Sequence, residues 1–464
     1  MLDKGLVEDV IFAALASGGD FAEVFVENSY NNAIKMVSGE VEEAITGNDY
    51  GIGIRIFSGT NAVYAFTNND SRDNLLKVAG EAARTLQGNF ELNTLNFITG
   101  QPINRHPILV DLRSKTQQDK VELLKKANRS AKSYDDLISQ VLVNYLENIQ
   151  QVLIANSEGA FVEDERVRTR TMIQAVASRG NEKQTGFHGP GAQMGFELYD
   201  KIDIEEYARE AARMAVTMIK ADFAPGGKMP VVIDNEFGGV IFHEACGHGL
   251  EATSVAKKTS IYADKLGEQI ASQLVTAIDD GTIPNGWGSQ NYDDEAVPME
   301  KKVLIEKGVL KSYMVDRLNG RRMGSNPTGS GRRQSYRYAP TSRMTNTYIA
   351  AGNSSPEEII SATEYGLYAR CMGGGSVNPA TGEFNFSVRE GYLIRDGKIA
   401  EPVRGATLIG KGSDVLKKID LVGNNLGFGE GMCGSISGSV PAGIGQPMIR
   451  VSELTVGGRK ESEQ

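Results

Sequence analysis

The chain has 464 residues, of which 40% are hydrophobic and 23% charged, and its formal net charge at pH 7 is −10. This composition is typical of a soluble globular protein, and the length favours two or three domains. The negative charge argues against a nucleic-acid-binding function, because such proteins carry clustered Lys and Arg that neutralise phosphates.

The sequence carries no sign of export or membrane insertion. Asp3, Glu8 and Asp9 interrupt the apolar pattern of residues 1–19, so we expect no signal peptide. No apolar run reaches the roughly eighteen residues that a membrane-spanning helix needs. The three cysteines cannot form a disulfide framework. We therefore expect a cytoplasmic protein.

The first half of the chain alternates between helical and strand patterns. Apolar residues at helical spacing predict helices over residues 2–17, 70–87, 115–133 and 204–218. Alternating segments separated by short polar turns predict a meander of antiparallel strands, over residues 22–27, 33–37, 41–46, 51–57, 62–67, 140–145 and 151–156.

A break rich in Pro and Gly at residues 221–228 marks the principal domain boundary. We predict an α+β protein. Residues 1–221 form an N-terminal mixed α/β domain with antiparallel strands and flanking helices. Residues 228–464 form a mainly β domain that carries one metal-binding helix at about residues 236–251. Hairpins are expected at 303–310 and at 392–399, where Asp-Gly suits a tight turn.

The strongest chemical signal is a pair of histidines five residues apart. His243 is followed directly by Glu244, and His248 comes next. The zincin motif His-Glu-x-x-His uses a spacing of four to place both imidazoles on one helical face. A spacing of five turns the second imidazole by roughly 140° on a regular helix. We therefore expect a distorted helix between His243 and Gly249, with one π-type turn. Two unrelated histidines are the alternative.

A catalytic zinc typically takes three protein ligands and leaves one position for water. Cys433 lies among glycines that would let the backbone approach a metal, and a thiolate suits zinc. Taken alone, a lone cysteine is more often a small packing residue of the core than a metal ligand.

An arginine-rich segment follows in a Gly-rich region. It is compatible with a local anion or carboxylate site and with ordinary surface ion pairing, and it comprises Arg321, Arg322, Arg332, Arg333, Arg337 and Arg343.

Residues 243–252 resemble the His-Glu-x-x-x-His segment of the TldD/PmbA zinc-dependent proteases, in its TldD branch. Further segments similar to that family are residues 343–348, 405–410, 431–434 and 440–447. The resemblance implies that His243, His248 and Cys433 bind zinc (Zn2+) and that Glu244 activates a water. Cys246 is then expected to be a packing residue.

The resemblance also implies a substrate and a partner. The family is thought to cleave short or unfolded peptides inside an enclosed dimer, either a homodimer or a heterodimer with a PmbA-type subunit that lacks the zinc motif. Residues 343–348 have the alternation of an edge strand that could pair with a peptide. Arg333, Tyr336 and Arg337 are candidates for stabilising the oxyanion.

Two rival functions remain open. One is a non-catalytic peptide-binding or modulator subunit of a TldD/PmbA-type dimer, and the other is a zinc hydrolase that acts on small amides.

Overall fold

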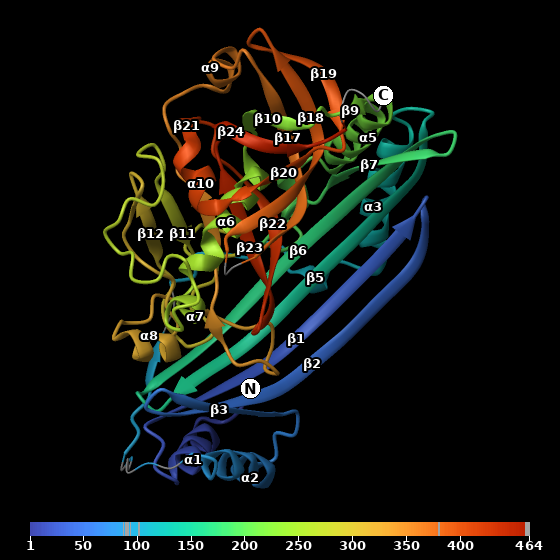
Figure 1. The fold of residues 1–464 in the computed structure, drawn as a ribbon. Helices are drawn as coiled ribbons and strands as arrows, with labels where there is room; N and C mark the ends of the chain where they lie inside the picture. Colours follow the sequence, from blue (N-terminus) through green and yellow to red (C-terminus); the bar gives the residue numbers. More distant parts are fainter. Residues whose placement is uncertain (87, 89–91, 93, 101–102, 379–380, 460–464) are drawn as a thin grey trace.

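The protein is described here by a computed structural model, which places residues 1–464 except 87, 89–91, 93, 101–102, 379–380 and 460–464 (Figure 1). The fold is α+β, as predicted: a long antiparallel sheet with helices forms the first half, and two further sheets with short helices form the second. No helix of the described part is long and apolar enough to cross a membrane.

The N-terminal sheet has the strand order β3-β2-β1-β5-β6-β4, with β7 and β8 also paired to β6. Its strands are β1 (Phe21–Val37), β2 (Glu40–Ser58), β3 (Asn61–Thr67), β4 (Ile98–Gly100), β5 (Ile138–Asn156), β6 (Ala160–Arg179), β7 (Glu182–His188) and β8 (Gly191–Ala192). Several predicted short strands are therefore parts of longer ones. Residues 22–27 and 33–37 both belong to β1, because the polar stretch between them continues the pairing with β2 and β5.

Two helical layers cover opposite ends of this sheet. The helices are α1 (Lys4–Leu15), α2 (Arg72–Ala83), η1 (Leu112–Ser114), α3 (Gln117–Lys132), α4 (Leu198–Lys201) and α5 (Ile204–Lys220). Val24 and Val26 of β1 pack with α1 and α2, whereas Ile34 and Met36 pack with α3 and α5. Figure 1 shows the two helix pairs at the two ends of the long strands. The four long helices confirm the predicted ones to within a few residues.

The second half contains an eight-stranded and a six-stranded sheet around one large core. The first comprises β9 (Asp222–Phe223), β10 (Gly227–Ile233), β17 (Tyr365–Val377), β18 (Glu383–Arg395), β19 (Lys398–Arg404), β20 (Thr407–Lys411), β21 (Ile419–Val422) and β24 (Ile449–Gly457). The second comprises β11 (Ala277–Asp280), β12 (Lys301–Glu306), β13 (Val309–Leu310), β16 (Asn346–Ile349), β22 (Gly427–Ser435) and β23 (Gly438–Gln446). A small ribbon joins β14 (Gly331–Arg332) to β15 (Thr341–Ser342).

Short helices connect these strands. They are η2 (Glu236–Gly239), α6 (Val240–Ala245), η3 (Gly247–Leu250), α7 (Ala252–Val255), α8 (Arg317–Met323), α9 (Pro356–Ser361), α10 (Gly412–Val415) and η4 (Leu416–Lys418). Both predicted hairpins are present, as β12–β13 and β18–β19. The second turns at Asp396 (φ 50°) and Gly397 (φ 68°), the positive values that a two-residue type I′ turn requires.

A buried ionic network joins the two halves. Arg55 of β2 donates to Glu23 of β1 at 2.9 Å and to Glu295 of the second half at 2.6 Å. Arg333 also donates to Glu23, at 2.6 Å. Burial would raise the pKa of Glu23, but Arg55 and Arg333 hold it below its usual value. Because these charges are paired only when the halves are in place, the network fixes their relative position.

One strand prediction is wrong. The segment 343–348 is not an edge strand, because β16 lies inside the six-stranded sheet between β11 and β23. An open edge is found instead on β2. There β3 pairs only with residues 52–58, so residues 40–51 have β1 on one side and no described strand on the other.

Candidate metal centre

The segment that carries the two histidines is a short helix with a sharp break. Val240, Ile241 and Phe242 of α6 are buried in the core of the second half. The N-terminus of α6 packs closely on β23, where a Cβ on Gly239 would lie 2.4 Å from the carbonyl oxygen of Gly445. Glycine is therefore required at this approach.

The predicted distortion is present, but it is not a π-type turn. Helix α6 ends at Ala245, Cys246 leaves helical geometry with φ −135° and ψ −47°, and a 3-10 turn follows over η3. A Cβ on Gly247 would lie 2.4 Å from Sδ of Met344, so the chain passes Met344 only because residue 247 is glycine. This break turns His248 back towards His243.

Three potential metal ligands converge. One ligand atom each of His243, His248 and Cys433 lies within 4.8 Å of the others. Cys433 Sγ lies 3.5 Å from Nε2 of His248, and the two imidazole rings are 5.1 Å apart at 88° to one another. Two imidazoles and one thiolate are a donor set that zinc accepts, and three protein ligands suit a catalytic site. The residues present therefore fit the metal.

Each imidazole is oriented by a second hydrogen bond. Nδ1 of His243 lies 3.1 Å from Oγ1 of Thr347, and Nδ1 of His248 lies 3.2 Å from Oε2 of Glu251. With each Nδ1–H donating outward, Nε2 is the nitrogen of each ring that faces the shared centre. Such outer partners are characteristic of metal-ligating histidines.

The charges of the cluster are mutually stabilised. Burial raises the pKa of Cys433, but the neighbouring imidazoles of His243 and His248 lower it to about 3. Burial would lower the pKa of His248, but Glu251 and Cys433 raise it well above its usual value. A thiolate is thus present at neutral pH, and the thiolate is the form that binds metal.

Cys433 is held in place through its backbone. It lies on β22 opposite Val440 of β23, and its carbonyl oxygen accepts a hydrogen bond from Arg343. Arg343 is fully buried and also donates to Ser437 Oγ at 2.9 Å and to the carbonyl of Gly438 at 2.7 Å. One guanidinium therefore connects the ligand to the turn of its own hairpin.

Glu244 lies beside the three ligands. Its Oε2 is 3.7 Å from Nε2 of His248, and its side chain is 26% exposed. Glu244 thus places a solvent-accessible carboxylate beside a ligand histidine, as a proton acceptor for an incoming water requires.

The other sequence candidates are engaged elsewhere. Arg333 donates to Glu23, and Arg337 donates to Asp49 at 2.8 Å. Tyr336 donates from its hydroxyl to the same Asp49 at 3.4 Å. The hydrogen bonds of these three side chains are thus directed at the N-terminal sheet, which does not favour them as oxyanion-stabilising residues.

The remaining cysteines lie outside the cluster. Cys246 is fully buried in the core, as expected of a packing residue, and Cys371 packs beside Met214 and Met218 of α5.

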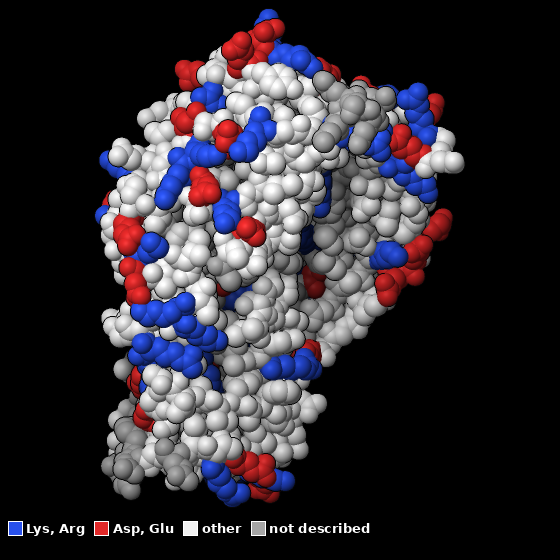
Figure 2. All heavy atoms as spheres, viewed as in Figure 1, with Lys and Arg blue, Asp and Glu red and all other residues white. Residues whose placement is uncertain are grey.

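A cavity of about 730 Å³ lies between the N-terminal sheet and the hairpin β22–β23, which carries Cys433. Met432, Val440 and Pro441 of that hairpin form one wall, and Trp287 forms part of another. Figure 2 shows this face of the molecule hollowed between the second half and the long strands. The hairpin therefore supplies both the cysteine ligand and a wall of the cavity.

Sequence reasoning missed Thr347, Glu251 and Arg343 as supporting residues. Glu251 is three residues after His248, which is a helical neighbour spacing and a usable signal. The other two are 104 and 90 residues from the groups they contact. No local pattern could have connected them.

Known proteins confirm the family. Profiles of the PmbA/TldA metallopeptidases match residues 22–86 as domain 1, 110–219 as the central domain and 226–458 as the C-terminal domain. A metalloprotease TldD homolog of Haemophilus influenzae is 38% identical over 449 residues, which cover 95% of this chain and 93% of that protein. A zinc metalloprotease TldD homolog of Saccharolobus solfataricus is 26% identical and covers 95% of this chain and 97% of its own length.

A solved structure supports the same fold. It is a Thermotoga maritima protein described as a modulator of DNA gyrase, with a TM-score of 0.81 and 23% identity, covering 98% of this chain and 100% of that one. The sequence matches place the chain in a family of metallopeptidases. The chain belongs to the PmbA/TldA family, and its curated relatives are TldD homologs.

Proposed function

We propose that this protein is a zinc-dependent metallopeptidase that hydrolyses peptide bonds of short or unfolded peptides. His243, His248 and Cys433 hold the metal, and Glu244 is the general base. The observation that carries the proposal is the convergence of the three ligand atoms within 4.8 Å, although Cys433 is 185 residues from His248 in the sequence.

The protein's own residues have distinct tasks in this mechanism. When bound, zinc polarises the scissile carbonyl and lowers the pKa of the attacking water. Glu244 accepts the proton of that water on its carboxylate and delivers it to the leaving amine nitrogen. Thr347 and Glu251 keep Nδ1 of the two histidines occupied, so that Nε2 stays available as the ligand.

The cavity and the open edge of β2 support an extended substrate. Ile45, Asn48 and Asp49 of that edge line the cavity. An extended peptide can add to an exposed strand edge through main-chain hydrogen bonds, which are independent of side-chain identity. Most strands of a folded protein are already paired, so short or unfolded chains are the substrates that fit best.

The proposal includes a dimer, either of two identical chains or with a PmbA-type subunit, as the family resemblance implies. It also includes a reducing compartment such as the cytoplasm. The thiol of Cys433 has to stay reduced to bind the metal.

The alternative hypothesis is that the protein is a modulator subunit without catalytic activity. The intact His243, Glu244 and His248 speak against it, because a purely binding subunit has no need of a base beside a metal site.

Metal content and cleavage of an unstructured peptide, measured together, test the proposal. We expect one zinc per wild-type chain, and loss of both zinc and cleavage in Cys433→Ala and His248→Ala. Glu244→Gln should keep the zinc and lose cleavage. Cys371→Ala, which changes a cysteine outside the cluster, is the matched control. A folded wild type that holds no zinc and cleaves nothing would support the modulator reading instead.

A further inference from the structure

The cavity between the N-terminal sheet and the hairpin β22–β23 is lined by five arginines, and among the described residues only two of them form an ion pair with a carboxylate. Arg333 is paired with Glu23, and Arg337 is paired with Asp49. The other three are Arg168, Arg170 and Arg332, which we call the arginine cluster. No ion pair of these three is present in the part of the chain that the structure describes.

The arginine cluster donates only to neutral oxygens. Arg168 donates to the carbonyls of Trp287 and Ser289 at 3.1 and 3.0 Å and to Gln193 Oε1 at 3.2 Å. Arg170 donates to the carbonyls of Gly189 and Glu430 at 3.0 and 2.8 Å. Arg332 donates to the carbonyl of Met344 at 2.6 Å. These bonds orient the guanidiniums. Buried carboxyl groups nearby, Asp294 above all, attract them, but none of these groups forms an ion pair with the arginine cluster within the described ranges.

All three side chains are buried, with exposed fractions of 5%, 8% and 1% for Arg168, Arg170 and Arg332. Burial lowers the pKa of Arg168 to about 9 and that of Arg332 to about 10; neighbouring arginines add to both effects, and the Asp294 carboxylate opposes them. Both groups therefore stay cationic at neutral pH. Buried like charges that lack a directly paired carboxylate destabilise the empty site, and an anion that enters it relieves this cost.

Arg332 presents the geometry that recognises a carboxylate. Its Nη1 is used for Met344, whereas Nε and Nη2 are buried and have no hydrogen-bond partner. These two N–H groups lie on one edge of the guanidinium, and that edge binds the two oxygens of a carboxylate through parallel hydrogen bonds.

The carboxylates of the cavity do not fill this role. Asp49 is paired with Arg337, and Glu147 is paired with Lys120 at 2.7 Å. Glu27 accepts from Gln150 at 2.8 Å, and burial raises its pKa, so that it is a weaker anion than usual.

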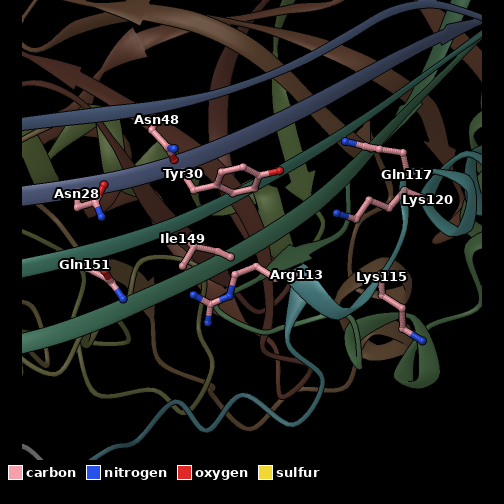
Figure 3. Close-up of a pocket in the computed structure, with 9 residues that line it drawn as sticks. All are labelled: Asn28, Tyr30, Asn48, Arg113, Lys115, Gln117, Lys120, Ile149 and Gln151. Atoms are coloured by element: carbon pink, nitrogen blue, oxygen red, sulfur yellow. The ribbon is translucent and has the colours of Figure 1, made fainter.

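A second hollow of about 470 Å³ beside α3 provides a comparison (Figure 3). It too is lined by three cations. Lys120 is paired with Glu147, and Arg113 is paired with Asp111 at 2.7 Å. Lys115 places Nζ 5.3 Å from the centre of the Phe196 ring. Most of the charge there is already compensated, which is the opposite of the arginine cluster.

We propose that the arginine cluster binds a carboxylate of the peptide substrate, with Arg332 as the bidentate partner. This inference rests on the proposed peptidase function and adds a substrate class: peptides with a free C-terminal carboxylate or an acidic side chain. The hairpin β22–β23 connects the two sites, since it carries Cys433 and also walls the cavity through Met432 and Pro441.

The chain carries its own probe for the test. Trp287 is the only tryptophan, lines the same cavity and has the Arg170 guanidinium 5.3 Å from its ring centre. An anion bound to the arginine cluster should therefore change its fluorescence. The full-length protein with Glu244→Gln would be used, so that bound peptides are not cleaved.

One unstructured peptide would be titrated in four forms: with a free or amidated C-terminus, each with acidic side chains or with their amides. We expect forms with a carboxylate to bind at least about tenfold more tightly than the fully neutral form. The two single-carboxylate forms show which source of the group is recognised. Equal affinity of all four forms would overturn the proposal.

Substitutions localise the effect. Arg332→Gln should remove the preference for carboxylate. Arg332→Lys should retain only part of it, because an ammonium group cannot form the two parallel hydrogen bonds of a guanidinium. Arg337→Gln removes an arginine of the same cavity whose charge is already paired, and it should keep the preference. If Arg332→Gln does not fold, Arg170→Gln replaces it, and an unchanged preference there would refute the proposal.

Binding and cleavage can fail separately. A wild type that prefers carboxylate peptides without cleaving any would refute the peptidase proposal alone. A wild type that cleaves acidic and neutral peptides equally well and binds them equally tightly would refute only the role of the arginine cluster.

Discussion

Glu251 is the residue whose replacement best tests the architecture of the metal centre. It is 5% exposed and its Oε2 lies 3.2 Å from Nδ1 of His248. A hydrogen bond to a charged group contributes about 1.5–3 kcal/mol. Glu251→Ala should therefore weaken zinc binding by about 10- to 150-fold. Glu251→Gln keeps an acceptor oxygen for the Nδ1–H and loses only the charge, so its effect should lie at the lower end.

The measurement is competition for zinc against a chromophoric chelator, with metal-stripped protein at pH 7. Glu268→Gln is the control, because Glu268 is an exposed carboxylate that pairs only with Lys265 on the surface. Far-UV circular dichroism verifies the fold of each variant. If both Glu251 variants bound zinc as tightly as the wild type, Glu251 would not orient His248, and the proposed ligand geometry would need revision.

We make three further predictions. Burial lowers the pKa of His106 to about 4. Between pH 6.5 and 4 the unfolded chain therefore binds a proton that the folded chain does not, and the free energy of unfolding falls by up to about 3 kcal/mol as the pH is lowered. Chemical denaturation at several pH values should show a weaker pH dependence of this free energy in His106→Gln. Gly412→Ala should abolish zinc binding, because its Cβ would lie 2.0 Å from the carbonyl oxygen of Ala245 at the end of α6, whereas Gly80→Ala meets nothing within 4 Å and should bind zinc normally. Arg55→Met leaves two buried glutamates with less compensation and should cost about 3–5 kcal/mol in denaturant unfolding; a loss below about 1 kcal/mol would show that the ionic joint is not needed for stability.

Local pattern predicted the four long helices and both hairpins of this protein. Helical apolar spacing and the Asp396-Gly397 turn are properties of a few consecutive residues, so they are readable without tertiary information. The length of β1 was not readable, because its polar middle at residues 28–32 looks like a turn and becomes a strand only through pairing on both sides. The prediction of an edge strand at residues 343–348 is wrong for the same reason: the strands that flank β16 come from distant parts of the chain.

The candidate site likewise has features that the local sequence predicts and features that depend on distant residues. The spacing of His243 and His248 showed that the helix must be distorted, but the form of the distortion depends on Met344, which packs against Gly247 from about a hundred residues away in the sequence. The alternating Arg166, Arg168 and Arg170 of β6 are visible as a pattern. Only the structure shows that Arg166 is paired with Asp294 at 2.6 Å and that the next two are unpaired.

The open edge of β2 has a consequence for self-association. An unpaired strand edge is a template on which a second chain can grow a sheet, and this is a common route to aggregation. The exposed stretch at residues 40–48 begins with Glu40, Glu42 and Glu43. Two copies of this edge would bring like carboxylates together, so the charges oppose fibre-like stacking of identical chains. The same negative charges favour pairing with a strand that carries lysine or arginine. The charge of the edge thereby selects which strands can pair with it.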